Sequence, residues 1–188
     1  ENLKTYKEQA GKLLDMGKVE FHYNSEWLLK LGYAEISEHA DQFSLAEFNA
    51  RENIKKRLKN GIRVSLREIL YPLMQGYDSV AVKADLELGG TDQRFNLLAG
   101  RDLQKHFKQD PQDILMVNLI EGTDGRKMSS SWGNTININD CANDMFGKIM
   151  SIPDNLIVKY LIHCTRMPME NINQMEKEMQ SGKLNPRD

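Results

Sequence analysis

The amino-acid sequence predicts an α/β fold that contains part of a parallel sheet and continues into helical segments. Residues 80–88 and 114–120 have strand-like patterns, and a helical pattern from about 92 to 107 lies between them. A strand, a helix and a second strand in this order form one unit of a parallel sheet. Because parallel sheets are covered on both faces, we expect residues outside this chain, or another chain, to complete the sheet.

Helical spacing of apolar residues dominates the sequence before the first strand. It predicts a helix over residues 3–16, and a second, short helix around 27–31 that ends at Gly32. A third helix is expected over 45–58, ending at Asn60-Gly61. Ser65 and Glu68 form a capping box, which predicts that a fourth helix starts there.

The segments after this fourth helix are the expected strands and the loops around them. Apolar and polar residues alternate from Val80 to Leu88, although the fourth helix can extend into the first of these residues. Gly89-Gly90 is expected to end this strand. The apolar run 114–120 predicts a second, buried strand, and the polar, Gly-rich stretch 121–135 predicts a loop.

Three further helices are expected after the loop. The first starts at Asn139 or Asp140, the second has Pro153 in its first turn, and the third opens at Pro168. Cys141 and Cys164 match no metal-binding or disulfide spacing, and we expect both to be reduced.

The composition is typical of a globular protein of nearly balanced charge. Hydrophobic residues make up 40%, charged residues 28%, and the net charge is -2. A protein that binds nucleic acid mainly through bulk charge would be basic, so any RNA contact must use a local patch or lie outside this chain. No apolar run approaches a membrane span, and residues 1–4 lack a signal-peptide pattern. We therefore expect a cytoplasmic protein without membrane contact.

Residues 71–78 are the first of three segments that predict a binding site. On a helix, Tyr71, Gln75 and Asp78 lie within about 60° of one another, so a phenol, an amide and a carboxylate project together. This combination suits a small zwitterion with a second polar end. The alternative is a helix whose polar residues face water.

Residues 88–93 form the second segment, which combines a strand end, a glycine pair and a helix start. Ligands of open α/β sheets bind at the carboxyl ends of the strands, and Gly90 allows close approach to the backbone. Asp92 and Gln93 are placed to hold a ribose hydroxyl or a carboxylate. The alternative is a tight turn in which Asp92 caps the helix.

Residues 124–134 form the third segment, a polar loop. Lys127 and the serine hydroxyls beside it can neutralise and hydrogen-bond phosphates. The loop is not a P-loop, because the sequence contains no G-x-x-x-x-G-K-[ST] pattern. The alternative is a solvated polar loop.

Together these segments resemble the signatures of the tyrosyl-tRNA synthetases, which are class I aminoacyl-tRNA synthetases. Residues 127–131 (KMSSS) resemble the KMSKS signature, and Tyr71, Gln75 and Asp78 match the Y-x-x-x-Q-x-x-D helix. Residues 89–93 look like the GGTDQ segment, and all three occur in the family's order and spacing. Residues 23–27 and 185–188 are also similar to bacterial members.

Two features depart from the family pattern. The four histidines cannot supply the HIGH motif, which needs two histidines three positions apart, so we expect the N-terminal half of the nucleotide fold to lie outside this chain. Ser130 stands where many bacterial members have the second lysine of KMSKS. This puts in doubt how much phosphate charge the loop neutralises.

The resemblance implies a Rossmann-like catalytic domain and a tyrosine-tRNA ligase reaction. ATP and Mg²⁺ would activate tyrosine to tyrosyl-adenylate, and the tyrosyl group would pass to the 3′ end of tRNA(Tyr). No residue is assigned as a metal ligand. The roles carried over are the phenol hydroxyl for Asp78, the α-ammonium for Tyr71 and Gln75, the carboxylate for Gln93, the ATP ribose for Asp92, the nucleotide backbone contact for Gly90, adenine for Leu119 and Ile120, and the departing pyrophosphate for Lys127, Ser129 and Ser130.

The resemblance also implies a domain organisation. Residues 1–140 would be the second half of the catalytic domain, with the KMSSS loop at 127–131 and a connective insertion at about 22–66 that forms much of the family's dimer interface. Residues 141–188 would begin the helical anticodon-binding region. The full-length enzyme is expected to be a homodimer and this chain alone to be inactive. Two alternatives stay open: a tryptophanyl-tRNA synthetase, and a non-catalytic, synthetase-like RNA-binding protein.

Overall fold

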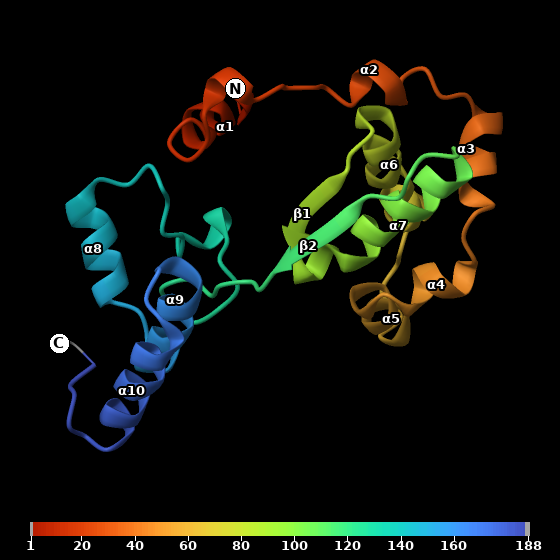
Figure 1. The fold of residues 1–188 in the computed structure, drawn as a ribbon. Helices are drawn as coiled ribbons and strands as arrows, with labels where there is room; N and C mark the ends of the chain where they lie inside the picture. Colours follow the sequence, from red (N-terminus) through yellow and green to blue (C-terminus); the bar gives the residue numbers. More distant parts are fainter. Residues whose placement is uncertain (1, 187–188) are drawn as a thin grey trace. The chain divides into compact units, whose positions relative to one another are not determined.

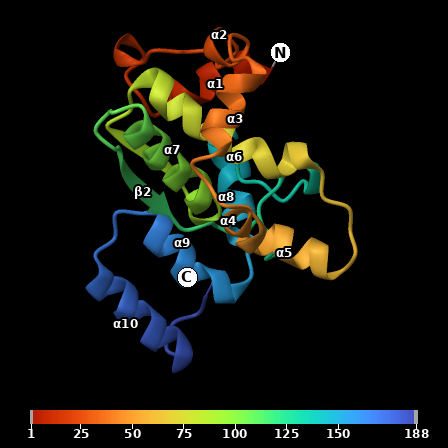
Figure 2. The ribbon, with the colours of Figure 1, turned by 90° about the vertical axis from the view of Figure 1, so that its right-hand side faces the viewer.

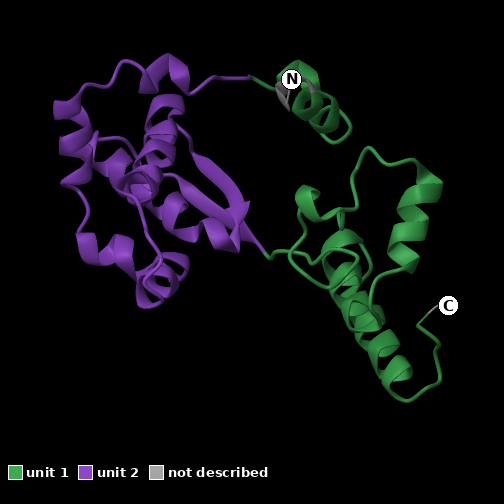
Figure 3. Cartoon of the chain, turned by 180° about the vertical axis from the view of Figure 1, so that it is seen from behind, with its two compact units in different colours: residues 1–20, 118–188 green, residues 21–117 purple. Residues whose placement is uncertain are grey.

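A computed structural model describes the backbone of residues 2–186 and the side chains of residues 5–186. The side chain of Leu3, in the first expected helix, and residues 187–188 of the family-like C-terminal segment lie outside the described residues. The chain divides into two compact units (Figure 3). We call residues 21–117 the sheet unit, and residues 1–20 together with 118–188 the loop unit.

The sheet unit is one strand–helix–strand arrangement preceded by a series of helices (Figure 1). Its elements are α2 (Ser25–Leu28), α3 (Tyr33–Ala40), α4 (Leu45–Ala50), α5 (Glu52–Lys59), α6 (Leu66–Val82), β1 (Leu86–Gly90), the 3-10 turn η2 (Thr91–Gln93), α7 (Arg94–His106) and β2 (Asp113–Val117).

Strands β1 and β2 pair in parallel, which confirms the predicted sheet unit. The register runs from Leu86 opposite Asp113 to Gly90 opposite Val117. The strand expected from Val80 begins only at Leu86, because α6 continues to Val82 and ends at a left-handed Lys83 (φ 52°). The strand ends at the Gly89-Gly90 pair as expected, and both glycines are still paired with β2.

One face of this sheet is apolar and exposed. Side chains alternate along a strand, so Leu86 and Leu88 share a face with Leu115 and Val117. These side chains are exposed by 58%, 65%, 54% and 51% respectively. The prediction of a buried second strand is therefore wrong for this chain, because its own helix α7 packs against the sheet and leaves these four side chains open.

The core of the sheet unit lies where α6 packs against α7. Leu73 and Val80 of α6, with Leu97 and Leu103 of α7, are buried. Glycines allow the two helices to approach closely. A Cβ atom on Gly76 would lie 3.1 Å from the backbone carbon of Ala99, and one on Gly100 would lie 2.6 Å from the Ser79 hydroxyl.

The helices before α6 differ in part from the expectation. Helix α3 was not predicted from the sequence pattern. Gly32, which was expected to end the preceding helix, is the N-cap of α3. The helix expected over 45–58 is divided at Arg51, whose backbone is extended (φ -58°, ψ 128°). The Arg51 guanidinium lies 5.7 Å from the Phe48 ring centre and 5.3 Å from that of Phe95, which ties the break to α7.

The helix boundaries that were predicted from capping residues agree with the structure. The Ser65 hydroxyl accepts from the Glu68 backbone N–H at 3.2 Å, and the Glu68 carboxylate accepts from the Ser65 N–H. This capping box begins α6 as predicted. Helix α5 ends at Lys59 with Asn60 as its C-cap, and Gly61 follows in the left-handed conformation (φ 67°).

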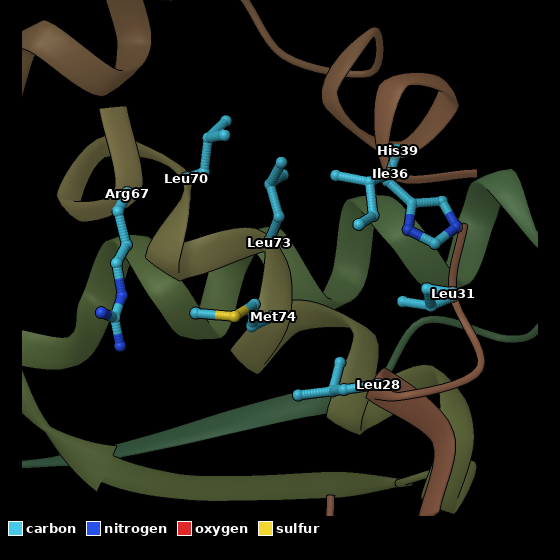
Figure 4. Close-up of a pocket in the computed structure, with 8 residues that line it drawn as sticks. All are labelled: Leu28, Leu31, Ile36, His39, Arg67, Leu70, Leu73 and Met74. Carbon is cyan, nitrogen blue, oxygen red and sulfur yellow. The ribbon is translucent and has the colours of Figure 1, made fainter. Parts of the chain in front are cut away.

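An apolar pocket of about 410 Å³ lies between α2, α3 and α6 (Figure 4). Leucine, isoleucine and methionine side chains line most of it, with Arg67 and His39 also present. His39 is buried, with its ring stacked on Tyr77 at 4.8 Å, and burial lowers its pKa. Helix α3 is thus fixed against α6 by an aromatic contact.

The loop unit consists of short helices and the polar loop. Its elements are α1 (Asn2–Ala10), the 3-10 turns η1 (Met16–Lys18), η3 (Ser130–Trp132) and η4 (Asp154–Leu156), and the helices α8 (Ala142–Met150), α9 (Ile157–Cys164) and α10 (Met169–Gln180). Buried Leu156, Tyr160 and Ile172 form its core, where α9 packs on α10 (Figure 2).

Its helix boundaries agree with the predicted ones only in part. Pro153 and Pro168 directly precede η4 and α10, as expected. The first helix ends at Ala10 and is shorter than the predicted 3–16. Helix α8 starts at Ala142, because the Asp140 carboxylate accepts from the Asn137 N–H and closes a turn before it. Among the described residues, no helix combines the length and apolar character needed to cross a membrane.

The close contact between α6 and α7 leads to a stability prediction. Gly100→Ala places a Cβ atom 2.6 Å from Ser79 Oγ and 2.8 Å from Gln112 Nε2, and should destabilise the protein by about 1–3 kcal/mol. Gly147→Ala in α8 is the matched control, because its Cβ meets nothing within 4 Å. It should be neutral or stabilise by up to about 1 kcal/mol. Thermal unfolding of both variants measures the difference, and equal melting temperatures would contradict the packing.

Candidate functional site

The predicted ligand-binding face of α6 is present. Tyr71, Gln75 and Asp78 lie on the same helix, and Tyr71 is exposed while the other two are half-buried. The helix continues through all three residues because the capping box starts it at Leu66 and the left-handed Lys83 ends it. Pro72 lies inside the helix and donates no bond to the Glu68 carbonyl, which instead accepts from the Arg51 guanidinium at 3.2 Å.

Asp78 is held by residues of the short helix α2 and its N-cap. Its Oδ1 atom accepts a hydrogen bond from the Trp27 indole at 2.7 Å. Burial raises the pKa of the Asp78 carboxyl and the nearby Glu87 charge raises it further, while hydrogen bonds from Trp27 and Asn24 act in the opposite direction. A carboxylate has about four lone-pair sites, so Asp78 can accept a further donor in addition to Trp27 and Asn24.

The Gln75 amide is connected to the glycine-rich segment after β1. Asn96 Nδ2 donates to Gln75 Oε1 at 2.9 Å and to Gln93 Oε1 at 3.0 Å. The side-chain amide of Asn96 therefore connects Gln75 and Gln93, two residues that were predicted to bind tyrosine. Gly90 is the last residue of β1, and Asp92 is exposed within η2, so Asp92 is not a helix N-cap.

The second group of predicted residues lies on the polar loop of the loop unit. Glu121 and Lys127 form an isolated antiparallel bridge, and the Gly122 N–H donates to the Arg126 carbonyl at 2.7 Å. The loop is thus a narrow hairpin with Lys127 at its returning end. Lys127 and Ser130 are exposed, and the Ser129 hydroxyl lies 2.9 Å from that of Ser131.

Asn134 organises this loop from inside. It is 3% exposed; its Oδ1 accepts from the Ser129 N–H at 2.8 Å, and its Nδ2 donates to the Lys127 carbonyl at 3.2 Å. The same Nδ2 donates to Asp124 Oδ1 at 2.8 Å. Gly122 is required beside it, since a Cβ there would lie 2.4 Å from the Asn134 carbonyl oxygen.

Charge pairing further stabilises the loop. The Asp124 carboxylate accepts from Asn134 and from the Arg126 backbone and guanidinium, and these bonds lower its pKa to about 2. The Arg126 guanidinium also lies 4.7 Å from the centre of the Trp132 ring. Arg126 is therefore engaged in the fold of the loop.

The start of the loop is attached to helix α9. Lys159 Nζ donates to the Glu121 carboxylate at 2.6 Å, and the Tyr160 hydroxyl donates to the Glu121 carbonyl at 2.5 Å. The Lys159 hydrogen bond lowers the pKa of Glu121. Leu119, which is exposed, and Ile120, which is half-buried, lie in the segment directly before this attachment.

The predicted site residues therefore form two groups, one on each unit. Sequence reasoning missed residues that hold them in place: Trp27 for Asp78, Asn96 for the two glutamines, Glu87 for Gln75, and Asn134 for the loop. Trp27 stands in a segment that resembles bacterial synthetases, and Asn134 stands in the signature loop. Nothing in the local pattern distinguished Glu87 or Asn96 from surface polar residues.

Among the side chains of residues 5–186, no group of three or more His, Cys, Asp or Glu is placed to hold a metal ion. Cys141 and Cys164 are both free and exposed.

Comparison with known proteins gives a consistent family. A family model described as class I tRNA synthetases (W and Y) matches residues 1–188. "Tyrosine--tRNA ligase" of Carboxydothermus hydrogenoformans is 56% identical over 189 residues, which is 100% of this chain and 46% of that protein. The protein of the same name from Thermotoga maritima is 48% identical over 100% of this chain and 47% of its own length. The chain thus spans about half the length of these relatives.

Solved structures support the fold. The tyrosyl-tRNA synthetase of Archaeoglobus fulgidus, solved with L-tyrosine, has a TM-score of 0.67 and 23% identity, covering 98% of this chain and 66% of that one. A mitochondrial tyrosyl-tRNA synthetase of Coccidioides posadasii, truncated at its C-terminus, has a TM-score of 0.55 and 21% identity over 98% of this chain and 58% of its own. Both likenesses show a class I synthetase Rossmann-like fold.

The central role of Asn134 leads to a prediction about the loop. Asn134→Ala removes the hydrogen bonds to Ser129, Lys127 and Asp124, and should increase amide hydrogen exchange across residues 121–134 by about tenfold or more. Asn155→Ala, on an exposed asparagine of the same unit, is the matched control and should leave this exchange unchanged. Unchanged exchange in Asn134→Ala would show that the loop does not depend on this side chain.

Proposed function

The chain belongs to the class I tRNA synthetase family of the tryptophan and tyrosine enzymes, and from this we propose that the protein containing it is a tyrosine-tRNA ligase. The observation that carries the proposal is the α6 face, where Asp78 lies on the same helix as Gln75 and Gln75 is joined through Asn96 to Gln93. Relatives 48–56% identical, named tyrosine--tRNA ligases, support it.

The sheet unit would bind tyrosine. Asp78 accepts the phenol hydroxyl through a carboxylate that Trp27 already orients. Tyr71 and the amide oxygen of Gln75 face the α-ammonium, and Gln93 lies near the carboxylate. These groups offer acceptors to the hydroxyl and to the ammonium, which are the two donors at opposite ends of tyrosine.

Residues proposed to bind ATP are present in each unit. Gly90 gives backbone access to the nucleotide, Asp92 binds the ribose, and Leu119 and Ile120 lie beside adenine. Lys127, with Ser129 and Ser130, covers the pyrophosphate as it departs. Mg²⁺ accompanies the ATP phosphates, as is usual for this ion, and no residue of this chain is assigned to it.

Such a reaction requires no protein nucleophile. The tyrosine carboxylate attacks the α-phosphate of ATP and pyrophosphate leaves, so the protein contributes by aligning the reactants and by stabilising the charge that develops. Lys127 acts on the leaving group, where negative charge increases toward the transition state. Transfer of the tyrosyl group to the 3′ end of tRNA(Tyr) then releases AMP.

The remaining parts of the chain would serve assembly and tRNA binding. Exposed Leu29, Tyr33 and Leu66, beside the apolar pocket, support a dimer interface in the insertion at 22–66. We place the end of the catalytic domain at about residue 140 and the start of the anticodon-binding region at 141–188, although the compact units divide at 117/118. We propose a cytoplasmic homodimer.

A tryptophanyl-tRNA synthetase is the second candidate, because the matching family model covers both enzymes. The carboxylate at position 78 favours tyrosine, since it offers an acceptor to a phenol hydroxyl. A non-catalytic RNA-binding protein is disfavoured by the presence of all the α6, β1 and loop residues described above.

The test of the proposed function is ATP–pyrophosphate exchange by the whole protein that contains this chain. We expect exchange that depends on tyrosine and is negligible with tryptophan. Exchange with tryptophan alone would identify the second candidate, and no exchange with either amino acid would support the non-catalytic one. The 188-residue chain by itself should give no exchange.

The role of Asp78 leads to a selectivity prediction. Asp78→Ala should lower kcat/KM for tyrosine at least about tenfold more than for phenylalanine, because only tyrosine has the hydroxyl that this carboxylate accepts. Gln75→Ala is the matched control on the same helix face and should lower both values alike, because both amino acids carry the same ammonium. Pyrophosphate exchange measures all four values. An unchanged tyrosine-to-phenylalanine ratio in Asp78→Ala would exclude Asp78 as the phenol acceptor.

A further inference from the structure

Glu87 lies at the centre of β1 and faces the two helices. It is half-buried, on the opposite side of the strand from exposed Leu86 and Leu88. Three donors converge on its carboxylate. Gln75 Nε2 donates to Oε1 at 3.3 Å, while Ser79 Oγ and Gln112 Nε2 donate to Oε2 at 3.0 and 2.5 Å. All three of these groups donate hydrogen bonds to a carboxylate that lies beside a predicted binding residue.

This carboxylate determines which way the Gln75 amide faces. An ionised carboxylate only accepts hydrogen bonds, so the NH₂ end of Gln75 must point to Glu87. The carbonyl oxygen of Gln75 is thereby turned the other way, where it accepts from Asn96 at 2.9 Å. The reversed amide would place its oxygen against Glu87 and its NH₂ against the NH₂ of Asn96, which is unfavourable at both ends.

The resulting arrangement suits an ammonium ion. The oxygens of Gln75 and Gln93 both accept from the single NH₂ group of Asn96, at 2.9 and 3.0 Å. An amide oxygen has two lone pairs, so the Gln75 oxygen can accept one N–H of a primary ammonium in addition to its bond from Asn96. The negative charge of Glu87, one side chain behind Gln75, also favours a cation at this place.

We propose that Glu87 is a positioning residue of the amino-acid site, which fixes the Gln75 amide with its oxygen toward the substrate ammonium. The inference rests on the proposed function and adds a residue that acts through Gln75. The competing explanation is structural: through Ser79 and Gln112, Glu87 joins β1 to α6 and to the start of β2. The two explanations differ in which ligands a change at Glu87 affects.

Two substitutions of graded severity test the proposal in the whole protein. Gln75 and Gln112 donate to different oxygens of the Glu87 carboxylate. In Glu87→Gln only one side-chain oxygen remains for these two donors, so the orientation of the Gln75 amide is only partly lost. Glu87→Leu removes the acceptor entirely. We expect KM for tyrosine in pyrophosphate exchange to rise about threefold and about tenfold respectively, with kcat within about twofold. Asp85→Asn removes a charge from an exposed side chain two positions away and should change neither constant.

Ligands that lack one end of tyrosine separate positioning from structure. Tyramine keeps the ammonium and lacks the carboxylate, and its inhibition constant should rise in parallel with KM for tyrosine. 3-(4-Hydroxyphenyl)propionate lacks the ammonium, and its inhibition constant should stay within about twofold in both Glu87 variants. Equal weakening of both inhibitors would show that Glu87 only maintains the local structure, and would overturn the proposal.

A double substitution tests whether Glu87 acts through Gln75. In a Gln75→Ala background, Glu87→Leu should have no further effect on KM for tyrosine. Effects that multiply would show that Glu87 acts independently of Gln75. If the unmodified protein shows no tyrosine-dependent exchange, the proposed function itself fails; if it shows exchange and both Glu87 variants keep its KM, only the role of Glu87 fails.

Discussion

The close approach of helices α6 and α7 is the constraint on which the sheet unit depends. Gly76 and Gly100 place no side chain in the contact, so each helix packs directly on atoms of the other. This brings Ser79 and Gln112 to the side of β1 where Glu87 points. A wider helix pair would separate the Gln75 amide from β1. The arrangement of the proposed amino-acid site thus depends on two glycines that are not among its predicted binding residues.

The two units present opposite chemistry to the proposed substrates. The sheet unit offers oxygen acceptors, from Asp78 and from the amides of Gln75 and Gln93, which suit a hydroxyl and an ammonium. The loop offers the exposed side chain of Lys127, which suits phosphate, while Arg126 is engaged with Asp124 and Trp132. Activation of an amino acid by a nucleotide requires both kinds of surface, so neither unit would suffice for the reaction.

The sequence predicted those features that local chemistry determines. The capping box at Ser65, the proline before α10 and the parallel strand order follow from short-range patterns, and the structure has them. Features that depend on distant partners were not predictable. The break at Arg51 depends on the ring of Phe95, far along the chain, and the exposure of β2 depends on what covers the sheet. For the site, the motifs indicated the proposed binding residues, but the residues that support them are defined only by contacts across the fold.

Gln104 shows how firmly the parts of the sheet unit are coupled. Its Nε2 donates to the carbonyls of Ser79 and Ala84 at 3.4 and 2.9 Å, and its Oε1 accepts from the Gln112 N–H at 2.7 Å. One buried side chain of α7 therefore completes the backbone hydrogen bonding at the end of α6, before β1 and before β2. If any one of these segments opened alone, a buried polar group would lose its hydrogen-bond partner. Helices α6 and α7 and the two strands should therefore unfold together, as a single cooperative block.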